Sequence, residues 1–209
     1  MSEVVHLVHL TEPSRRDELA AEVRGLVEPH ARRTLIAATL PGGIDAGDLI
    51  VRLRFADESG RRAAEEVVDR WSREPSIERV ETATFTGTPT PGRHSAAPSV
   101  YRVLLVAVDP HADRALVDRF ETETAAMPDY IHAIGTSLLS RAGDPGGHGW
   151  THIWEQEFTD IDGLTGPYMT HPYHWAHIDR WFDPEHGTKI VNRLCHSFCA
   201  LDTALLSSS

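Results

Sequence analysis

The sequence has little cysteine, no cluster of basic residues and no long apolar run. Only two of its 209 residues are cysteines, and no stretch approaches the roughly 18 apolar residues of a membrane span. The formal net charge is −11 and no run of Lys or Arg occurs, which argues against nucleic acid and anionic membrane as partners. Residues 1–13 lack a basic segment followed by an apolar core, so we expect no secretory signal and a cytoplasmic location.

The two cysteines, Cys195 and Cys199, are four residues apart near the C-terminus. On a helix they would share a face, and two buried, reduced thiols are the favoured interpretation. A zinc site that includes His196 is the alternative. It is weak, because the sequence has no second ligand pair at finger-like spacing.

Residues 86–99 are rich in Pro, Gly, Ser and Thr and almost free of large apolar side chains. This is the composition of a linker. We therefore predict an N-terminal domain at residues 1–85 and a C-terminal domain at residues 100–209.

Each half shows the same order of predicted elements, β-α-β-β-α-β. Apolar, β-branched runs predict the strands, and charged segments with apolar residues at helical spacing predict the helices. The predicted strands are 4–10, 33–40, 47–55 and 77–85, then 100–108, 130–139, 149–158 and 189–198. The predicted helices are 14–28, 60–71, 112–127 and 161–182. This order predicts an α+β fold, with tandem ferredoxin-like repeats packed sheet to sheet as a dimeric α/β-barrel within one chain.

The second half carries most of the aromatic and imidazole side chains. It holds all four tyrosines, four of the five tryptophans and nine of the 13 histidines. Such uneven loading of two copies of one fold indicates that the C-terminal copy carries a site and the N-terminal copy is mainly a scaffold.

The predicted strand "GWTHIWEQEF", residues 149–158, combines a histidine with two indoles. Alternation along a strand places Trp150, His152 and Trp154 on one face, together with Gln156 and Phe158. Burial of this kind lowers the pKa of an imidazole and leaves it neutral, as a general base must be. The alternative is a core histidine whose ring bonds to a backbone carbonyl.

A second stretch, "YMTHPYHWAHIDRW" at residues 168–181, has histidines three residues apart at 171, 174 and 177. The spacing suggests a metal triad. Pro172 lacks an N–H and favours extended geometry at His171, so we expect one helix to end near Thr170 and another to begin at Pro172. The break separates the three histidines, and we therefore rank metal binding below acid–base chemistry.

After the break, His174, Ile178 and Trp181 are expected to share one helix face. The glycine-rich turn at residues 143–150 lacks the strand-then-helix context of a phosphate loop. His148 in that turn is a candidate to close over a cavity.

These two stretches together resemble the signature of the stress-responsive A/B-barrel family, also called Dabb or dimeric α/β-barrel domains. The resemblance is specific over residues 148–182, looser over 100–147 and architectural over 1–85. It implies a ferredoxin-like unit that pairs into a barrel. The site residues resemble those of olivetolic acid cyclase, a plant polyketide cyclase of this family that needs neither metal nor organic cofactor.

By this resemblance, His174 corresponds to the general base, Tyr168 to its partner and His152 to the Thr-His histidine of the family. Two positions depart from the family pattern. Its strand-one histidine falls at Arg102, and another tyrosine of its site falls near Phe120.

We accordingly predict a catalytic set of His174, Tyr168 and His152. A first-copy histidine, His6, could supply what the second copy has lost. The predicted substrate-binding residues are His171, Trp150, Trp154, Phe120, Trp175, His6 and Arg102.

The predicted function is that of a lyase, cyclase or isomerase that uses His-Tyr acid–base chemistry and no cofactor. Its partner would be a small hydrophobic aromatic or polyketide-like carbonyl compound, because apolar walls suit such a molecule. The alternatives are a haem- or metal-binding α/β-barrel, a cofactor-free monooxygenase and a non-enzymatic stress-response protein. A monomer and a homodimer are both compatible with the linked halves.

Overall fold

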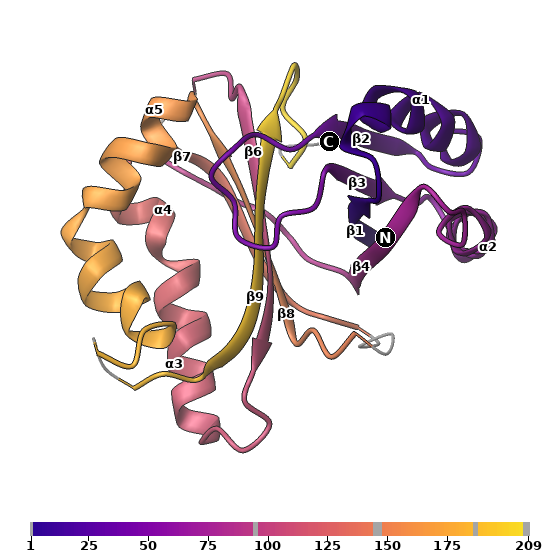
Figure 1. Cartoon of the computed structure of the whole chain (residues 1–209). Helices are drawn as coiled ribbons and strands as arrows, with labels where there is room; N and C mark the ends of the chain where they lie inside the picture. The colour runs from indigo at the N-terminus through magenta and orange to yellow at the C-terminus, as the bar shows by residue number, and fades with distance from the viewer. Residues whose placement is uncertain (1, 94–95, 144–147, 186–187, 207–209) are drawn as a thin grey trace.

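The computed structural model describes residues 2–93, 96–143, 148–185 and 188–206 (Figure 1). The first half contains β1 (Glu3–Leu10), a short 3₁₀ turn η1 (Pro13–Arg15), α1 (Arg16–Val27), β2 (Arg33–Ala38), β3 (Leu49–Arg54), α2 (Glu58–Trp71) and β4 (Ile77–Phe85). Its strands form an antiparallel sheet in the order β2-β3-β1-β4. The predicted β-α-β-β-α-β order of this half is confirmed.

The second half repeats this plan. It contains β6 (Val100–Val108), α3 (Arg114–Ala125), α4 (Met127–Tyr130), β7 (Ile134–Arg141), β8 (His152–Phe158), α5 (Ile161–Gly163), the π-helical turns η2 (Leu164–Tyr168) and η3 (His174–Ile178), the 3₁₀ turn η4 (Asp179–Trp181) and β9 (Val191–Ala200). The sheet order is β5-β7-β8-β6-β9. The edge strand β5 (Thr90–Pro91) comes from the predicted linker, which therefore pairs with the second sheet. The division into two domains stays a prediction.

The two sheets pack face to face and the helices cover their outer faces (Figure 1). Alternation along the first strand of each half decides which side chains face the other sheet. Val5 and Leu7 of β1 share an apolar cluster with Val103 and Leu105 of β6. The alternate residues of the same strands pack against the helices instead. The predicted α+β fold, with two ferredoxin-like units packed as a barrel within one chain, is confirmed.

A buried ion pair also joins the sheets. Arg52 of β3 donates from Nε to Glu155 Oε1 of β8 over 3.1 Å, and its Nη2 lies 2.8 Å from Glu3 Oε2 of β1. Tyr101 of β6 donates its hydroxyl to the same Glu155 oxygen at 2.5 Å. Glu3 is 3% exposed and the other three residues are fully buried, so the halves share a buried charge network as well as an apolar core.

Two predicted strands, those at 130–139 and 149–158, begin three or more residues later than the sequence pattern suggests. Residues 127–130 form the helix α4, because Pro128 stands at its start, where a missing N–H costs no hydrogen bond. The strand predicted at 149–158 begins at His152, because Gly149 adopts a positive φ of 73° that interrupts the extended backbone.

The C-terminal cysteines lie on the strand β9 and not on a helix. Cys195 and Cys199 are buried, free thiols that face the other sheet. His196 points to the opposite face, as alternation requires, so the zinc alternative through these three residues is wrong. Among the described helices, none is long and apolar enough to cross a membrane.

Candidate functional site

The helical segment after β8 breaks where Pro172 predicts a break. Helical backbone ends at Thr170 and resumes at Pro172, with His171 between them. The ring of His171 accepts a hydrogen bond at Nδ1 from the backbone N–H of Tyr173, with a length of 3.1 Å. His171 therefore caps the second helical segment, in the way a polar side chain satisfies a free N–H at a helix start.

The three histidines of this stretch have three different partners. His174 Nδ1 lies 3.1 Å from Asp179 Oδ1, whereas His177 Nδ1 lies 3.3 Å from Glu123 Oε1. His171 serves as the cap. They do not converge as metal ligands, and the described part of the chain contains no group of three or more His, Cys, Asp or Glu side chains that could hold a metal ion.

His174 and Tyr168 are in contact, as the resemblance implies. Their ring centroids are 4.7 Å apart in an edge-to-face arrangement at 68°. The guanidinium carbon of Arg102 lies 5.0 Å from the Tyr168 centroid and 4.6 Å from the ring of Trp154. Tyr168 also packs edge to face on Phe158, at 5.2 Å. A cation, an imidazole and three aromatic rings thus meet over the second sheet.

The register of the sheet explains this meeting. Arg102 of β6 stands directly opposite Gln156 of β8. On its other side Arg102 stands opposite Phe198 of β9. His196 is two residues from Phe198 along β9, so it lies on the same face of the sheet and is a diagonal neighbour of Arg102. Arg102 donates from Nη1 to Gln156 Oε1 at 2.5 Å and from Nε to His196 Nε2 at 2.9 Å.

A cavity of about 180 Å³ opens beside Arg102 and His174. Its walls are mainly apolar, and its polar lining consists of a guanidinium, two imidazoles and one carboxylate. The lining residues are Ile44, Arg102, Leu104, Trp154, Met169, His174, Ile178, Asp179, Phe182, Leu194 and His196. Tyr168 is fully buried behind this lining, and its hydroxyl has no hydrogen-bond partner among the described residues.

Burial controls the protonation of these groups. Desolvation lowers the pKa of His174 below its ordinary value of 6.5, and the charge of Arg102 lowers it further, although Asp179 opposes both effects. Desolvation, and then Arg102, lowers the pKa of His196 to about 3. Burial raises the pKa of Tyr168 to about 12. At neutral pH the site therefore presents two neutral imidazoles, a neutral phenol and one cation.

The first half contributes Ile44 to the rim of this cavity. Ile44 lies in the connection between β2 and β3, which crosses β9 (Figure 1). Ile44 and His196 exchange backbone hydrogen bonds of 3.0 Å and 2.7 Å. The N-terminal copy thus shapes the site by a loop whose contact with β9 the sequence pattern did not predict.

His152 is not part of this cavity. Its Nε2 bonds to Glu121 Oε1 at 2.8 Å, and its ring packs edge to face on Phe120 with centroids 5.4 Å apart. It stands four residues from Gln156 along β8, roughly 13 Å at the usual rise of a strand. His152 thus lies under α3, the helix that carries Phe120 and Glu121, whereas the broken helix that carries His174 covers the other end of the strand.

Two predicted wall residues also lie elsewhere. Trp150 precedes β8, so strand alternation does not reach it; it packs between the sheets and donates from Nε1 to Glu81 Oε2 at 3.0 Å. Trp175 is 56% exposed and donates from Nε1 to the carbonyl of Met169. Trp154, by contrast, lines the cavity. Sequence reasoning missed Asp179, although it stands in the same stretch as His174.

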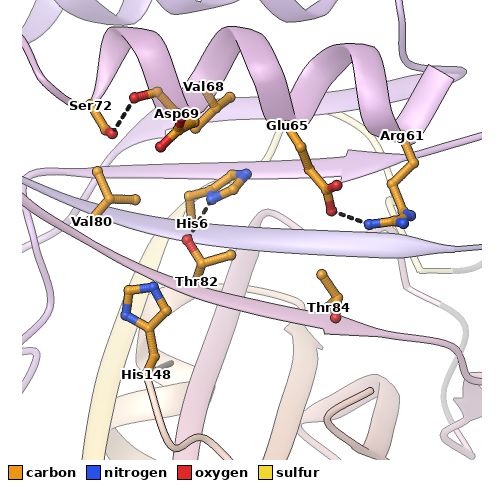
Figure 2. Close-up of a pocket in the computed structure, with 10 residues that line it drawn as sticks. All are labelled: His6, Arg61, Glu65, Val68, Asp69, Ser72, Val80, Thr82, Thr84 and His148. Atoms are coloured by element: carbon orange, nitrogen blue, oxygen red, sulfur yellow. Dashed lines mark hydrogen bonds and ion pairs between the residues drawn. The ribbon is translucent and has the colours of Figure 1, made fainter. Parts of the chain in front are cut away.

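His6 lies in a second, separate cavity of about 550 Å³ in the first half (Figure 2). It faces α2 on the outer side of the first sheet, and its Nδ1 is 2.8 Å from Thr82 Oγ1 of β4. His148, from the segment before β8, reaches the same cavity, so the expectation that His148 closes over a cavity fits this one. Because strand alternation turns His6 away from the second sheet, it does not supply a group to His174.

The polar groups of this second cavity satisfy one another. Arg61 pairs with Glu58 and Glu65 on its own helix, and His6 bonds to Thr82. The cavity beside Arg102 differs, because in the part of the chain that the structure describes nothing hydrogen-bonds to the Tyr168 hydroxyl behind it. Buried groups without partners mark a site built for a ligand more often than satisfied ones do. We therefore take the cavity beside Arg102 as the candidate active site.

Residues 100–192 match the model of the stress responsive A/B barrel domain. This segment belongs to the stress responsive A/B barrel family. The match includes Arg102, Tyr168 and His174, and it ends just before His196. No curated protein matches the chain.

Solved structures resemble this chain over almost its full length. An anthrone oxidase-like protein has a TM-score of 0.65 at 9% identity, covering 99% of this chain and 94% of its own. A protein from Fusobacterium nucleatum subsp. nucleatum, provisionally assigned as a monooxygenase, has a TM-score of 0.62 at 9% identity with 98% and 95% coverage. Chlorite dismutase from Candidatus Nitrospira defluvii has a TM-score of 0.55 at 13% identity with 96% and 91% coverage. At these identities the likeness is one of fold.

Proposed function

We propose that the protein catalyses proton transfer at carbon next to a carbonyl group, as a cofactor-independent lyase, cyclase or isomerase with His174 as the general base. The observation that carries the proposal is the pairing of a neutral His174 with Asp179, 3.1 Å away, in an apolar cavity that also contains Arg102. An imidazole kept neutral by burial can accept a proton, and an adjacent carboxylate stabilises the imidazolium that results.

In the proposed reaction, His174 removes a proton from carbon and Asp179 stabilises its charge. The electron pair moves onto the carbonyl oxygen, and the positive charge of Arg102 in the same cavity stabilises the resulting enolate. His174 then returns the proton to carbon or to a leaving oxygen. The resemblance makes Tyr168 the partner of the base. Because its hydroxyl lies behind the cavity lining, we give it the role of positioning the Arg102 guanidinium and the His174 ring.

The substrate is proposed to be a flat carbonyl compound. Trp154, Leu104 and Phe182 offer apolar walls, and a cavity of about 180 Å³ accommodates one aromatic ring with a short substituent. Larger substrates would extend past the rim, where Met169 and Ile44 are 46% and 57% exposed.

The test is deuterium exchange at an activated methyl group. Acetophenone, 3-acetylbenzoate and 4-acetylbenzoate are incubated in D₂O, and loss of the acetyl proton signal is followed by NMR. The wild type is expected to accelerate exchange of at least one probe, and His174→Gln to reduce that acceleration by about 10²–10⁴-fold. Exchange at the buffer rate for all three probes, or an undiminished rate with His174→Gln, would contradict the proposal.

A second candidate uses the same deprotonation to start a cofactor-free oxidation. The full-length fold likeness to an anthrone oxidase-like protein favours this option. Anthrone and O₂ would give anthraquinone and water, with the anthrone carbanion as the electron donor. Oxygen uptake with anthrone that depends on His174 would support this oxidation. Proton exchange without oxygen uptake would rule it out and favour the lyase, cyclase or isomerase function.

A further inference from the structure

Two buried arginines, Arg52 and Arg102, lie on central strands of the two sheets, and their hydrogen-bond partners differ in charge. Arg52, fully buried, is held by the carboxylates of Glu3 and Glu155 at 2.8 Å and 3.1 Å. Arg102, 5% exposed, bonds to the amide oxygen of Gln156 and to a ring nitrogen of His196. Among the described residues, no carboxylate forms an ion pair with Arg102.

A buried guanidinium without an anion is costly. Transfer of an ion out of water carries a penalty of several kcal/mol that neutral acceptors recover only in part. The rings of Trp154 and Tyr168 lie against the cation at 4.6 Å and 5.0 Å and offset some of that penalty. The remaining deficit would be removed by an anion that enters from the adjoining cavity, which Arg102 itself lines.

The chemistry of the cavity limits which anion fits. Arg102 is the only Lys or Arg among the described lining residues, and Asp179 adds a negative charge to the same lining. A phosphate, which carries close to two charges at neutral pH, would leave one of them uncompensated. A carboxylate carries one charge, and its two oxygens match the two-pronged geometry of a guanidinium.

We propose that this cavity binds an aromatic carboxylate, with the carboxylate on Arg102, the ring against Trp154 and the reacting carbonyl arm toward His174. The proposal rests on the proposed function of the same site and specifies its substrate class. It also gives a reason for an arginine at the position where the family has a histidine: a fixed charge selects an acid over its neutral analogue.

The experiment compares two matched probes, 4-acetylbenzoate and 4-acetylbenzamide, by isothermal titration calorimetry. The wild type is expected to bind the acid at least about tenfold more tightly than the amide. Arg102→Gln and Arg102→Met should bind both probes alike. Arg193→Gln is the control: Arg193 also packs its guanidinium on an indole, that of Trp150, but outside the cavity, so selectivity should be unchanged.

Equal affinity for acid and amide in the wild type would overturn the inference. Selectivity that survives in an Arg102→Met variant with cooperative thermal unfolding would also overturn it. If Arg102→Met does not fold, the Arg102→Gln variant and the acid–amide comparison in the wild type decide the question.

His174→Gln separates this inference from the proposed function. It should keep the selectivity for the acid while it loses proton exchange. Selectivity that depends on Arg102, with exchange indifferent to His174, would uphold carboxylate binding and remove the proposed chemistry. The reverse result is exchange that depends on His174, with no selectivity for the acid that depends on Arg102. It would overturn the inference of carboxylate binding and leave the proposed chemistry in place.

Discussion

Arg102 donates a hydrogen bond of 2.9 Å from Nε to Nε2 of His196. The ring nitrogen can accept it only while it carries no proton, so this imidazole and this guanidinium cannot both be charged and bonded. Burial and the adjacent cation lower the pKa of His196 to about 3, and burial lowers that of His6 to about 4.

These depressed pKa values predict that acid weakens the fold well before the carboxylates titrate. The unfolded chain takes up protons at both histidines as the pH falls through about 6.5, whereas the native state does not, so stability falls with pH. For each such histidine, the unfolding free energy should drop by about 1.4 kcal/mol per pH unit between about pH 6 and pH 5. Urea unfolding at several pH values measures this. His6→Asn should reduce the slope, and a flat profile in the wild type would contradict the account.

The ion pair between the sheets should be worth far more than an exposed one. Arg52→Met leaves Glu155 buried without a cation, whereas Glu3 keeps its pair with Arg54, and the loss should cost about 3–5 kcal/mol of unfolding free energy. The matched control is Arg62→Met, because Arg62 is 72% exposed in its pair with Glu58 and should change stability by about 1 kcal/mol or less. Similar losses for the two variants in urea unfolding would count against the network as a link between the sheets.

His171 should prove to be a structural cap. His171→Ala removes the acceptor for the Tyr173 N–H and should cost about 0.5–2 kcal/mol. His171→Asn keeps a short polar acceptor and should recover most of that loss. Added Zn²⁺ should not change the thermal unfolding of the wild type through this residue, and a zinc-dependent rise in Tm that disappears in His171→Ala would restore the metal interpretation.

The loop from the first half should be necessary for the shape of the cavity. A Cβ at Gly43 would clash with the carbonyl oxygen of His196, so Gly43→Ala must displace the loop that carries Ile44. We expect a loss of about 1–3 kcal/mol and weaker binding of 4-acetylbenzoate. Gly25→Ala is the control, since nothing lies within 4 Å of its added Cβ and the change in α1 should stabilise by about 0.5–1 kcal/mol. Equal binding by the two variants would show that the loop is dispensable.

The order of elements followed from the sequence because it depends on local patterns. Alternating and helical periodicities revealed both repeats, and the geometry of Pro172 predicted the break at His171. The contact between His174 and Tyr168 came from a family signature within one short stretch.

The partners of Arg102 were not predictable in the same way. Its contacts with Gln156 and His196 depend on the register of β6 against two strands far away in the chain, which no local pattern encodes. The positive φ of Gly149 interrupts the strand before Trp150, so Trp150 does not lie on the strand face predicted for it together with His152 and Trp154. His152 was misplaced because the sequence does not show which helix crosses which end of β8.

The measurement that most directly tests the central claim, that a neutral His174 is the base, is the pH dependence of proton exchange in 4-acetylbenzoate. The wild-type rate should rise as His174 loses its proton and level off, with an apparent pKa below its ordinary 6.5 because burial and Arg102 lower it. His177→Gln, a change three residues away at a ring paired with Glu123, should keep this profile. His174→Gln should abolish it. A rate that still climbs above about pH 8, or a His174→Gln profile like that of the wild type, would contradict the account.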